Sequence, residues 1–161
     1  MPSNRDIVSV ERVINAPPEV IFNLLADPAR HPEIDGSGSV LKVRPGSTPR
    51  LTKDATFGMD MRRGMRYAMQ NTVTEFDEGR RIAWAPRMTG GVGSRFGGRV
   101  WRYELEPSGD GTLVRETWDI TQENLRFVLR LVAAKQTRQD MTKSLEQLDQ
   151  LVTAGSAAAG S

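Results

Sequence analysis

The sequence predicts an α+β domain in which a curved, seven-stranded antiparallel sheet wraps around one long C-terminal helix. The helix is indicated by an apolar stripe late in the chain, where apolar residues recur at steps of three and four, the spacing of one helix face. They are Leu125, Val128, Leu129, Val132, Met141, Leu145, Leu148 and Val152. The sheet is indicated by the long stretch before it, which alternates apolar and polar side chains as half-buried strands do. A sheet that curls around a helix leaves a space between the two, and we expect the function there.

The N-terminal part of the chain predicts one strand followed by two short helices. Ile7–Ile14 is rich in β-branched residues, and its apolar positions fit no single alternation, so we expect a bulge within this strand. Pro18–Ala26 is predicted to be helical because Asn15 can cap it and proline suits the first helical turn. Pro28–Ile34 is the second short helix, which ends before a glycine-rich reversal.

Six more strands follow, separated mostly by short turns that contain Gly or Asp, as in antiparallel hairpins. We place them at Val40–Arg44, Ala55–Arg62, Met65–Phe76, Ile82–Ala85, Arg99–Glu106 and Leu113–Ile120. One connection differs, because Pro86–Gly98 contains five glycines and predicts a longer, mobile loop. The last element is the helix, from Thr121 to about Val152.

Length and composition fit a single globular domain. With 161 residues and 17.9 kDa, the chain can bury about two-thirds of the surface that its unfolded form exposes. We assign residues 1–153 to this domain and expect a disordered tail at 154–161, where the sequence is AGSAAAGS. A polar N-terminus and the lack of a long apolar run predict neither a secretory signal nor an integral membrane segment, and therefore a cytoplasmic protein.

Charge and residue counts argue against several classes of site. The net charge of +2 is too small to indicate nucleic acid binding, and the outer arginines lack interleaved aromatic residues on which bases stack. With no cysteine there is no disulfide and no thiolate ligand or nucleophile. One histidine without a cluster of acidic residues predicts no metal site. The segment GVGSRFG at 91–97 lacks the spacing of a dinucleotide-binding loop, so we expect no cofactor.

Large rings and thioethers on one face of the sheet predict the wall of a cavity, because both adapt to ligands of irregular shape. We expect ligand contacts from Phe57, Met59, Met61, Tyr67, Met69, Trp84, Trp101, Tyr103 and Trp118 in the sheet, from Leu125, Val128, Leu129 and Val132 in the helix, and from Phe96 in the glycine-rich loop. In that loop, Phe96 could close over a ligand while Arg95 meets an anionic group. The alternatives are ordinary core packing for the wall and a plain flexible hairpin for the loop.

Glu116 is the most unusual residue of the predicted sheet, because alternation places its carboxyl on the apolar face between Val114 and Trp118. Loss of water raises the pKa of a carboxyl group towards neutrality, where it can protonate a carbonyl or remove a proton beside one. Tyr103 and Asn71 share this face and could polarise or orient a ligand. Two alternatives for Glu116 stay open, an ion pair with a base from the last helix and a shifted register. Asn71 could equally satisfy a backbone group.

His31 and Asp35 form a second candidate pair, in the short helix and turn before the second strand. A histidine held by a carboxylate can act as a general base, because the carboxylate fixes its tautomer. The alternative is that both residues are surface or capping residues.

The order of these elements resembles that of the START/Bet v 1-like superfamily, also called the polyketide cyclase/dehydrase-like family, from about Ile7 to Val152. The segments that carry the resemblance are NAPPEVIFNLLAD at 15–27, VTEFD at 73–77, YELEP at 103–107 and GTLV at 111–114. The resemblance implies a helix-grip fold around a deep hydrophobic cavity that binds a lipid, sterol, polyketide or similar compound. Some members of the family catalyse cyclisation, aromatisation or dehydration in that cavity, and others carry a ligand or regulate a partner, so the fold alone does not decide the activity.

Three hypotheses follow for the function of this chain. The first is binding or transport of a small hydrophobic ligand, such as a lipid, polyketide or aromatic compound. The second is an enzyme of the polyketide cyclase, aromatase or dehydratase type, with Glu116 as general acid or base. The third is an interaction module similar to the co-chaperone members of the superfamily. An open cavity with a buried polar group favours the enzyme, a purely apolar one the carrier, and a filled interior the interaction module. The sequence leaves a homodimer open.

Overall fold

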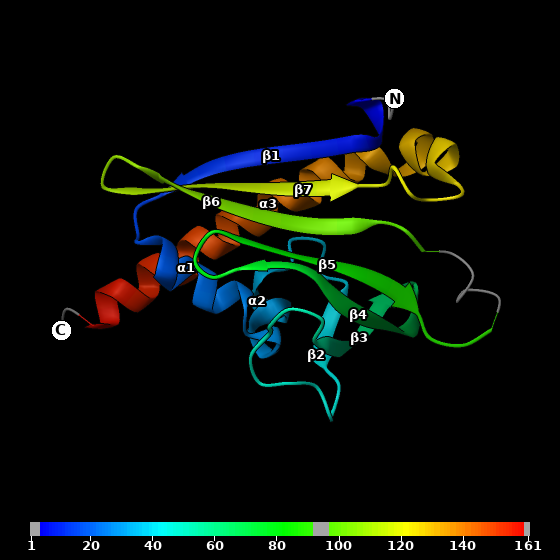
Figure 1. Ribbon diagram of the computed structural model, residues 1–161, viewed down its shortest axis with the longest axis horizontal. Helices are drawn as coiled ribbons and strands as arrows, with labels where there is room; N and C mark the ends of the chain where they lie inside the picture. The colour runs from blue at the N-terminus through cyan, green and yellow to red at the C-terminus, as the bar shows by residue number, and fades with distance from the viewer. Residues whose placement is uncertain (1–3, 92–96, 160–161) are drawn as a thin grey trace.

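The computed structural model describes residues 4–91 and 97–159 and contains one sheet, one long helix and several short helical segments (Figure 1). The strands are β1 (Ile7–Ile14), β2 (Val40–Val43), β3 (Thr56–Arg63), β4 (Met65–Asp77), β5 (Arg81–Met88), β6 (Val100–Ser108) and β7 (Gly111–Asp119). The α-helices are α1 (Pro18–Leu25), α2 (His31–Ile34) and α3 (Arg126–Ala159), and the 3-10 helices are η1 (Asn4–Asp6) and η2 (Pro28–Arg30).

The seven strands form a single antiparallel sheet in the order β1-β7-β6-β5-β4-β3-β2. Helix α3 crosses one side of this sheet diagonally and contacts β1, β7, α1 and α2 (Figure 1). The helix-grip fold expected from the sequence is therefore confirmed, with a curved sheet around a long C-terminal helix and short helices after the first strand.

The structure corrects three details of the N-terminal region. Strand β1 pairs with β7 in one continuous register from Ile7 to Ile14, so the predicted bulge is absent from this strand. The misleading residue is Val13, which points outwards and is exposed while Ile14 is buried. Helix α1 starts after Pro17, whose side chain cannot accept a capping hydrogen bond, and Asn15 is not its cap. The second predicted helix is one 3-10 turn followed by a single turn of α2.

Strand β5 is longer than predicted and continues through Pro86 to Met88. Its pairing with β6 ends at Trp84, whereas its pairing with β4 continues to Met88. Beyond Trp84 the strand is therefore an edge on the β6 side, where the missing N–H of proline breaks no ladder hydrogen bond.

Helix α3 differs from its predicted bounds at both ends. It begins at Arg126 because residues 121–125 form turns, in which Asp119 Oδ1 accepts hydrogen bonds from the backbone N and side chain of Thr121. It ends at Ala159, so residues 154–159 are helical where we expected a disordered tail. This difference agrees with the high helix propensity of alanine, which is frequent in this segment.

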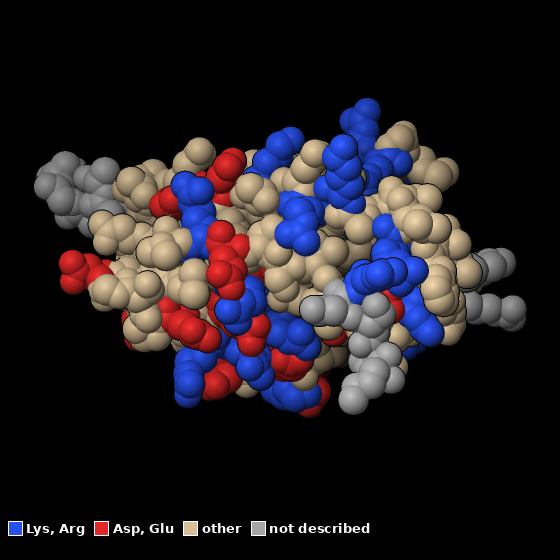
Figure 2. Space-filling view, turned by 90° about the horizontal axis from the view of Figure 1, so that it is seen from above, with Lys and Arg blue, Asp and Glu red and all other residues tan. Residues whose placement is uncertain are grey.

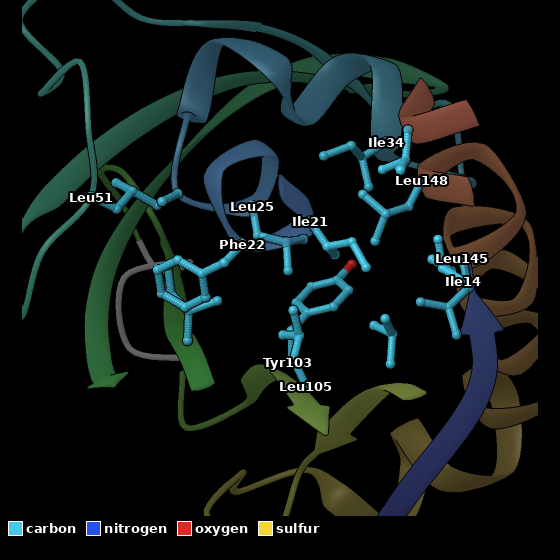
Figure 3. Close-up of a cluster of buried hydrophobic side chains, with 14 of the residues drawn as sticks. Ile14, Ile21, Phe22, Leu25, Ile34, Leu51, Tyr103, Leu105, Leu145 and Leu148 are labelled. Carbon is cyan, nitrogen blue, oxygen red and sulfur yellow. The ribbon is translucent and has the colours of Figure 1, made fainter. Parts of the chain in front are cut away.

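The main hydrophobic core lies between the sheet, α1 and the C-terminal half of α3 (Figure 3). Its labelled members come from every layer of the fold: Ile14, Ile21, Phe22, Leu25, Ile34, Leu51, Tyr103, Leu105, Leu145 and Leu148. A smaller cluster of Val8, Trp118, Ile120 and Met141 lies further towards the start of α3. In α3 itself Met141, Leu145, Leu148 and Val152 are buried, whereas Val128 and Val132, like Leu125 just before the helix, are exposed. Only the C-terminal half of the predicted apolar stripe therefore packs into the core.

Two contacts fix where α3 lies over the sheet. The backbone of Gly36 passes so close that a Cβ atom at this position would lie 2.2 Å from the carbonyl oxygen of Asp140, and its N–H donates to Ser144 Oγ at 2.9 Å. At the other end, the buried carboxylate of Asp6 lies 3.7 Å from the guanidinium of Arg126 and 3.2 Å from that of Arg130. The helix is thus held at its middle and at its start.

Candidate ligand-binding cavity

A cavity of about 570 Å³ lies between the sheet and the N-terminal half of α3. All nine sheet residues predicted to contact a ligand line it: Phe57, Met59, Met61, Tyr67, Met69, Trp84, Trp101, Tyr103 and Trp118. They come from β3, β4, β5, β6 and β7, because inward side chains of neighbouring antiparallel strands lie side by side. The interior of the fold is therefore not filled by its own side chains.

One row of α3 forms the helical wall of this cavity. Leu129, Ala133, Thr137 and Met141 all line it, and their four-residue spacing puts them on a single helix face. Of the four helix residues predicted to contact a ligand, only Leu129 lines the cavity. Leu125, Val128 and Val132 are exposed and absent from the lining, because the apolar stripe of the sequence combines an inward row with outward positions.

The cavity opens to solvent at the hairpin between β3 and β4 and at the end of β5. Met65 and Met88 line the cavity and are nevertheless exposed, and Arg63 lines the same end. Phe96 and Arg95, which we expected to form a gate, lie outside the described residues.

Glu116 lies deep in this cavity and is only 3% exposed. It faces Tyr103 across the β6–β7 pair, as the predicted alternation requires, and accepts a hydrogen bond from the Tyr103 hydroxyl. Its Oε2 atom has no hydrogen-bond partner, and no Lys or Arg in the described part of the chain forms an ion pair with it. The predicted inward position is therefore observed, and the alternative of an ion pair with α3 is not.

Burial changes the protonation of this pair. Removal from water raises the pKa of Glu116 from 4.5 to about 8; the hydrogen bond from Tyr103 opposes this rise, and the negative charge of Asp35 adds to it. Burial also raises the pKa of Tyr103 well above 10, and the neighbouring Glu116 adds to this shift. At neutral pH both groups are therefore neutral. The single hydroxyl proton of Tyr103 is already donated to Glu116, so it is the carboxyl proton of Glu116 that can be donated to a ligand or to a reacting atom.

His31 is buried and lines the cavity, where it stacks on Trp84 with ring centres 4.9 Å apart and meets the Phe57 ring edge-on. Its Nε2 lies 2.8 Å from the carbonyl oxygen of Leu25, which can only accept, so Nε2 carries the proton and Nδ1 is an acceptor. Burial lowers the pKa of His31, which favours this neutral form. His31 is thus neither a surface nor a capping residue.

Asp35 also lines the cavity, but it is not the group that sets the tautomer of His31. Its carboxylate accepts hydrogen bonds from the backbone N and hydroxyl of Ser37 and from the backbone N of Val40. These bonds organise the turn into β2. The structure therefore brings His31 and Asp35 to one cavity without joining them as a catalytic pair.

Asn71 lines the cavity and is buried, and its Nδ2 donates to the carbonyl oxygen of Phe57 at 3.3 Å. This is the backbone-satisfying role that the sequence left open as the alternative to ligand binding. Asn71 helps to hold β3 and β4 in position behind the aromatic wall.

Sequence reasoning missed a polar rim on the α2–α3 side of the cavity. It consists of Ser37, Ser39, Thr137, Asp140 and Ser144, together with Arg99 near the mouth. Small polar residues in a loop carry no periodic signal, but Ser144 could have been found because it lies three residues after Met141 on the same helix face. Arg99 is already paired, since its Nε donates to the buried Glu123 at 2.8 Å.

In the part of the chain that the structure describes, no group of three or more His, Cys, Asp or Glu side chains could hold a metal ion. In the same residues, no helix combines the length and the apolar character needed to span a bilayer.

Comparison with known proteins gives one family match and several structural relatives. The family model described as polyketide cyclase / dehydrase and lipid transport matches residues 5–153. The uncharacterized protein Rv0088 of Mycobacterium tuberculosis is 32% identical over 111 residues, which is 66% of this chain and 44% of that protein. The chain thus spans less than half the length of this relative.

Two solved structures illustrate the similarity of fold. Protein CV1439 of Chromobacterium violaceum has a TM-score of 0.71 at 20% identity, with 91% of this chain and 96% of that chain covered. DynU16, a putative protein in the dynemicin biosynthetic locus, has a TM-score of 0.66 at 15% identity, with 93% of this chain and 48% of that chain covered. At these identities the likeness concerns the fold alone.

Proposed function

The chain belongs to the polyketide cyclase/dehydrase and lipid transport family, and we propose that it binds a small apolar molecule in the cavity between its sheet and α3. The observation that carries this proposal is the cavity itself. Its volume of about 570 Å³ is within the range of small-molecule sites, and its wall is made mainly of aromatic rings and thioethers around a few polar groups.

The polar end of the cavity indicates which apolar molecules fit best. At neutral pH the carboxyl group of Glu116 is protonated and its Oε2 has no partner, whereas the Tyr103 hydroxyl already donates to Glu116. This end therefore favours a ligand with a neutral acceptor such as a carbonyl or hydroxyl oxygen. The same end contains Asp35, whose negative charge disfavours a buried anionic group. A neutral aromatic or polycyclic ketone combines the required features, because its rings can pack against the apolar wall while its carbonyl oxygen accepts a hydrogen bond from Glu116.

Intrinsic fluorescence tests ligand binding directly, because all three tryptophans of the chain line the cavity. Titration with a series of neutral aryl ketones should give saturable quenching of one-to-one stoichiometry. Ala133→Phe, which places a ring in the cavity, should weaken binding about tenfold or more. Val132→Phe on the exposed face of the same helix is the matched control and should bind as the wild type does. Quenching that does not saturate, or equal affinity in both variants, would overturn the proposal.

A second candidate function is acid–base catalysis on the bound ligand. The observation that favours it is the buried Glu116 carboxyl, which has an unpartnered oxygen and a pKa near the working pH. In its protonated form it can protonate a ligand carbonyl, and in its ionised form it can remove a proton beside one. Both steps occur in cyclisation and dehydration.

The variant Glu116→Gln distinguishes catalysis from ligand transport. Glutamine keeps the shape of the glutamate side chain and a hydrogen-bond donor, but it transfers no proton. Product formation from a poly-β-keto ester, followed by mass spectrometry, should be lost in this variant while ligand quenching remains. Wild-type turnover should depend on pH with a transition near 8. If the wild type binds the ligand but forms no product, the catalytic hypothesis is wrong and the protein is a ligand carrier. The interaction-module hypothesis is not favoured, because a filled interior would have supported it and the interior contains a cavity.

A further inference from the structure

The first turns of α3 expose an apolar face that the cavity does not use. Five large apolar side chains are between 48% and 81% exposed: Leu125 just before the helix, and Phe127, Val128, Leu131 and Val132 within it. Helical positions three and four residues apart are neighbours, so these side chains form one continuous surface, which we call the α3 face. Contiguous exposed apolar surface is uncommon in a soluble protein and marks a place of contact.

The α3 face is bordered by positive charge. From residue 124 to residue 139 every charged residue is basic, namely Arg126, Arg130, Lys135 and Arg138. The guanidinium groups of Arg126 and Arg130 lie 5.7 and 4.9 Å from the centre of the Phe127 ring, so charge and apolar surface are interleaved. Figure 2 shows blue side chains predominating at the end of the molecule where Figure 1 places the start of α3, whereas red and blue mix elsewhere on that side.

Acidic side chains near this face are few and buried. Asp6 pairs with Arg126 and Arg130, and Glu123 pairs with Arg99. Both carboxylates are almost completely buried, so the surface presented to a partner is apolar and positive.

We propose that the α3 face docks on the surface of an anionic phospholipid bilayer, with its apolar side chains in the interface and its basic side chains against the headgroups. Helices that lie in the membrane interface combine large apolar residues with Arg and Lys in this way. Each basic side chain near an anionic membrane surface adds favourable electrostatic energy. A second copy of the chain is a poor occupant, because a twofold contact through this face would bring its arginines and lysine against like charges.

Docking in this orientation also brings the cavity close to the bilayer. Leu129 and Ala133 line the cavity from the same turns of α3 that carry the exposed side chains. The end of β5, where Met88 lies at the mouth, is at the same end of the molecule as the start of α3 (Figure 1). If the cavity binds an apolar ligand as proposed above, a ligand dissolved in the membrane reaches it over a short path. The docking itself does not depend on that function.

Vesicle flotation with the full chain tests this proposal. The protein should float with vesicles of phosphatidylcholine and phosphatidylserine, float far less with phosphatidylcholine alone, and be released by high salt. Leu131→Glu, at the most exposed position of the α3 face, should weaken binding about tenfold or more. Val13→Glu, which changes an exposed valine on β1 away from this face, is the matched control and should float as the wild type does.

Urea unfolding of both variants shows whether a substitution changes stability, and light scattering shows whether it changes the oligomeric state. With both measurements, each outcome supports or overturns the proposal. No flotation of the wild type with anionic vesicles overturns the proposal, as does equal loss in Leu131→Glu and Val13→Glu at unchanged stability. A wild-type dimer that Leu131→Glu converts to a monomer assigns the face to a second copy and overturns it. Binding to a soluble acidic polypeptide without flotation on anionic vesicles overturns it in favour of a protein partner.

Discussion

The position of Glu116 in the fold keeps its carboxyl group neutral, and this makes the free energy of unfolding depend on pH. In the unfolded chain the group loses its proton near pH 4.5, whereas in the folded protein it does so near pH 8. Between these values the folded state binds the extra proton, so rising pH favours unfolding. The contribution is fully present below pH 4.5 and is lost as pH rises through 8.

Urea unfolding across this pH range checks the shift. Wild-type stability should fall relative to that of Glu116→Gln as pH rises, because glutamine does not titrate. Asp35 and Tyr103 face the same site and remain unchanged in the variant, which therefore serves as the reference. Parallel stability curves for the two proteins would contradict the raised pKa.

At the residue scale, the sheet side of the cavity was predictable and the helix side was only partly so. A strand has two faces, so placing Trp118 inwards also places Glu116 inwards. A helix has no such strict rule, and the exposed Val132 satisfies the same apolar pattern as the cavity-lining Leu129. The partner of His31 could not be predicted either, since the Leu25 carbonyl becomes available only through the turn between α1 and α2.

At the scale of elements, α3 consists of a packed half and an unpacked half. Leu148 is completely buried in the main core, whereas Leu131 is mostly exposed near the helix start. Leu148→Ala should lower the free energy of unfolding by about 2–5 kcal/mol through loss of burial and a residual cavity. Leu131→Ala, the same change on the same helix, should alter it by less than about 0.5 kcal/mol. Equal effects in chemical denaturation would contradict this division.

The distance between α2 and α3 depends on Gly36, whose backbone lies directly against that of α3. A methyl group there would overlap the carbonyl of Asp140 and the backbone of Ser144, neither of which can move without moving the helix. Gly36→Ala should therefore destabilise the protein by about 1–3 kcal/mol or more. Gly46→Ala, at a turn where a Cβ meets no neighbour but the φ angle is positive, controls for the backbone effect of losing glycine. A smaller loss in Gly36→Ala than in Gly46→Ala would show that the contact is not restrictive.

The bounds of the elements illustrate what a linear pattern leaves out. Pro86 is a reasonable sequence signal for the end of a strand, yet β5 continues because β6 has already diverged. The exposed Val13 obscured the regular alternation of β1 in the same way. In both cases the decisive information was the presence or absence of a neighbouring strand.

At the scale of the whole molecule, the cavity links ligand binding to global stability. A ligand that binds only the folded form, present at a hundred times its dissociation constant, stabilises that form by about 2.7 kcal/mol. For a chain of this length the melting midpoint should rise by about 5–10 °C. Differential scanning fluorimetry with the ketone series should show this rise for the wild type and for Val132→Phe, and little or none for Ala133→Phe.

The division of α3 also has a consequence for how such a domain can diversify. Residues that hold the architecture together are concentrated in the C-terminal half of this helix, and residues that meet small molecules or surroundings are concentrated before Met141. Mutations accumulate most freely where they perturb folding least. Changes in the early turns of α3 can therefore alter what the domain binds at little cost in stability, whereas changes in the later turns disturb the core.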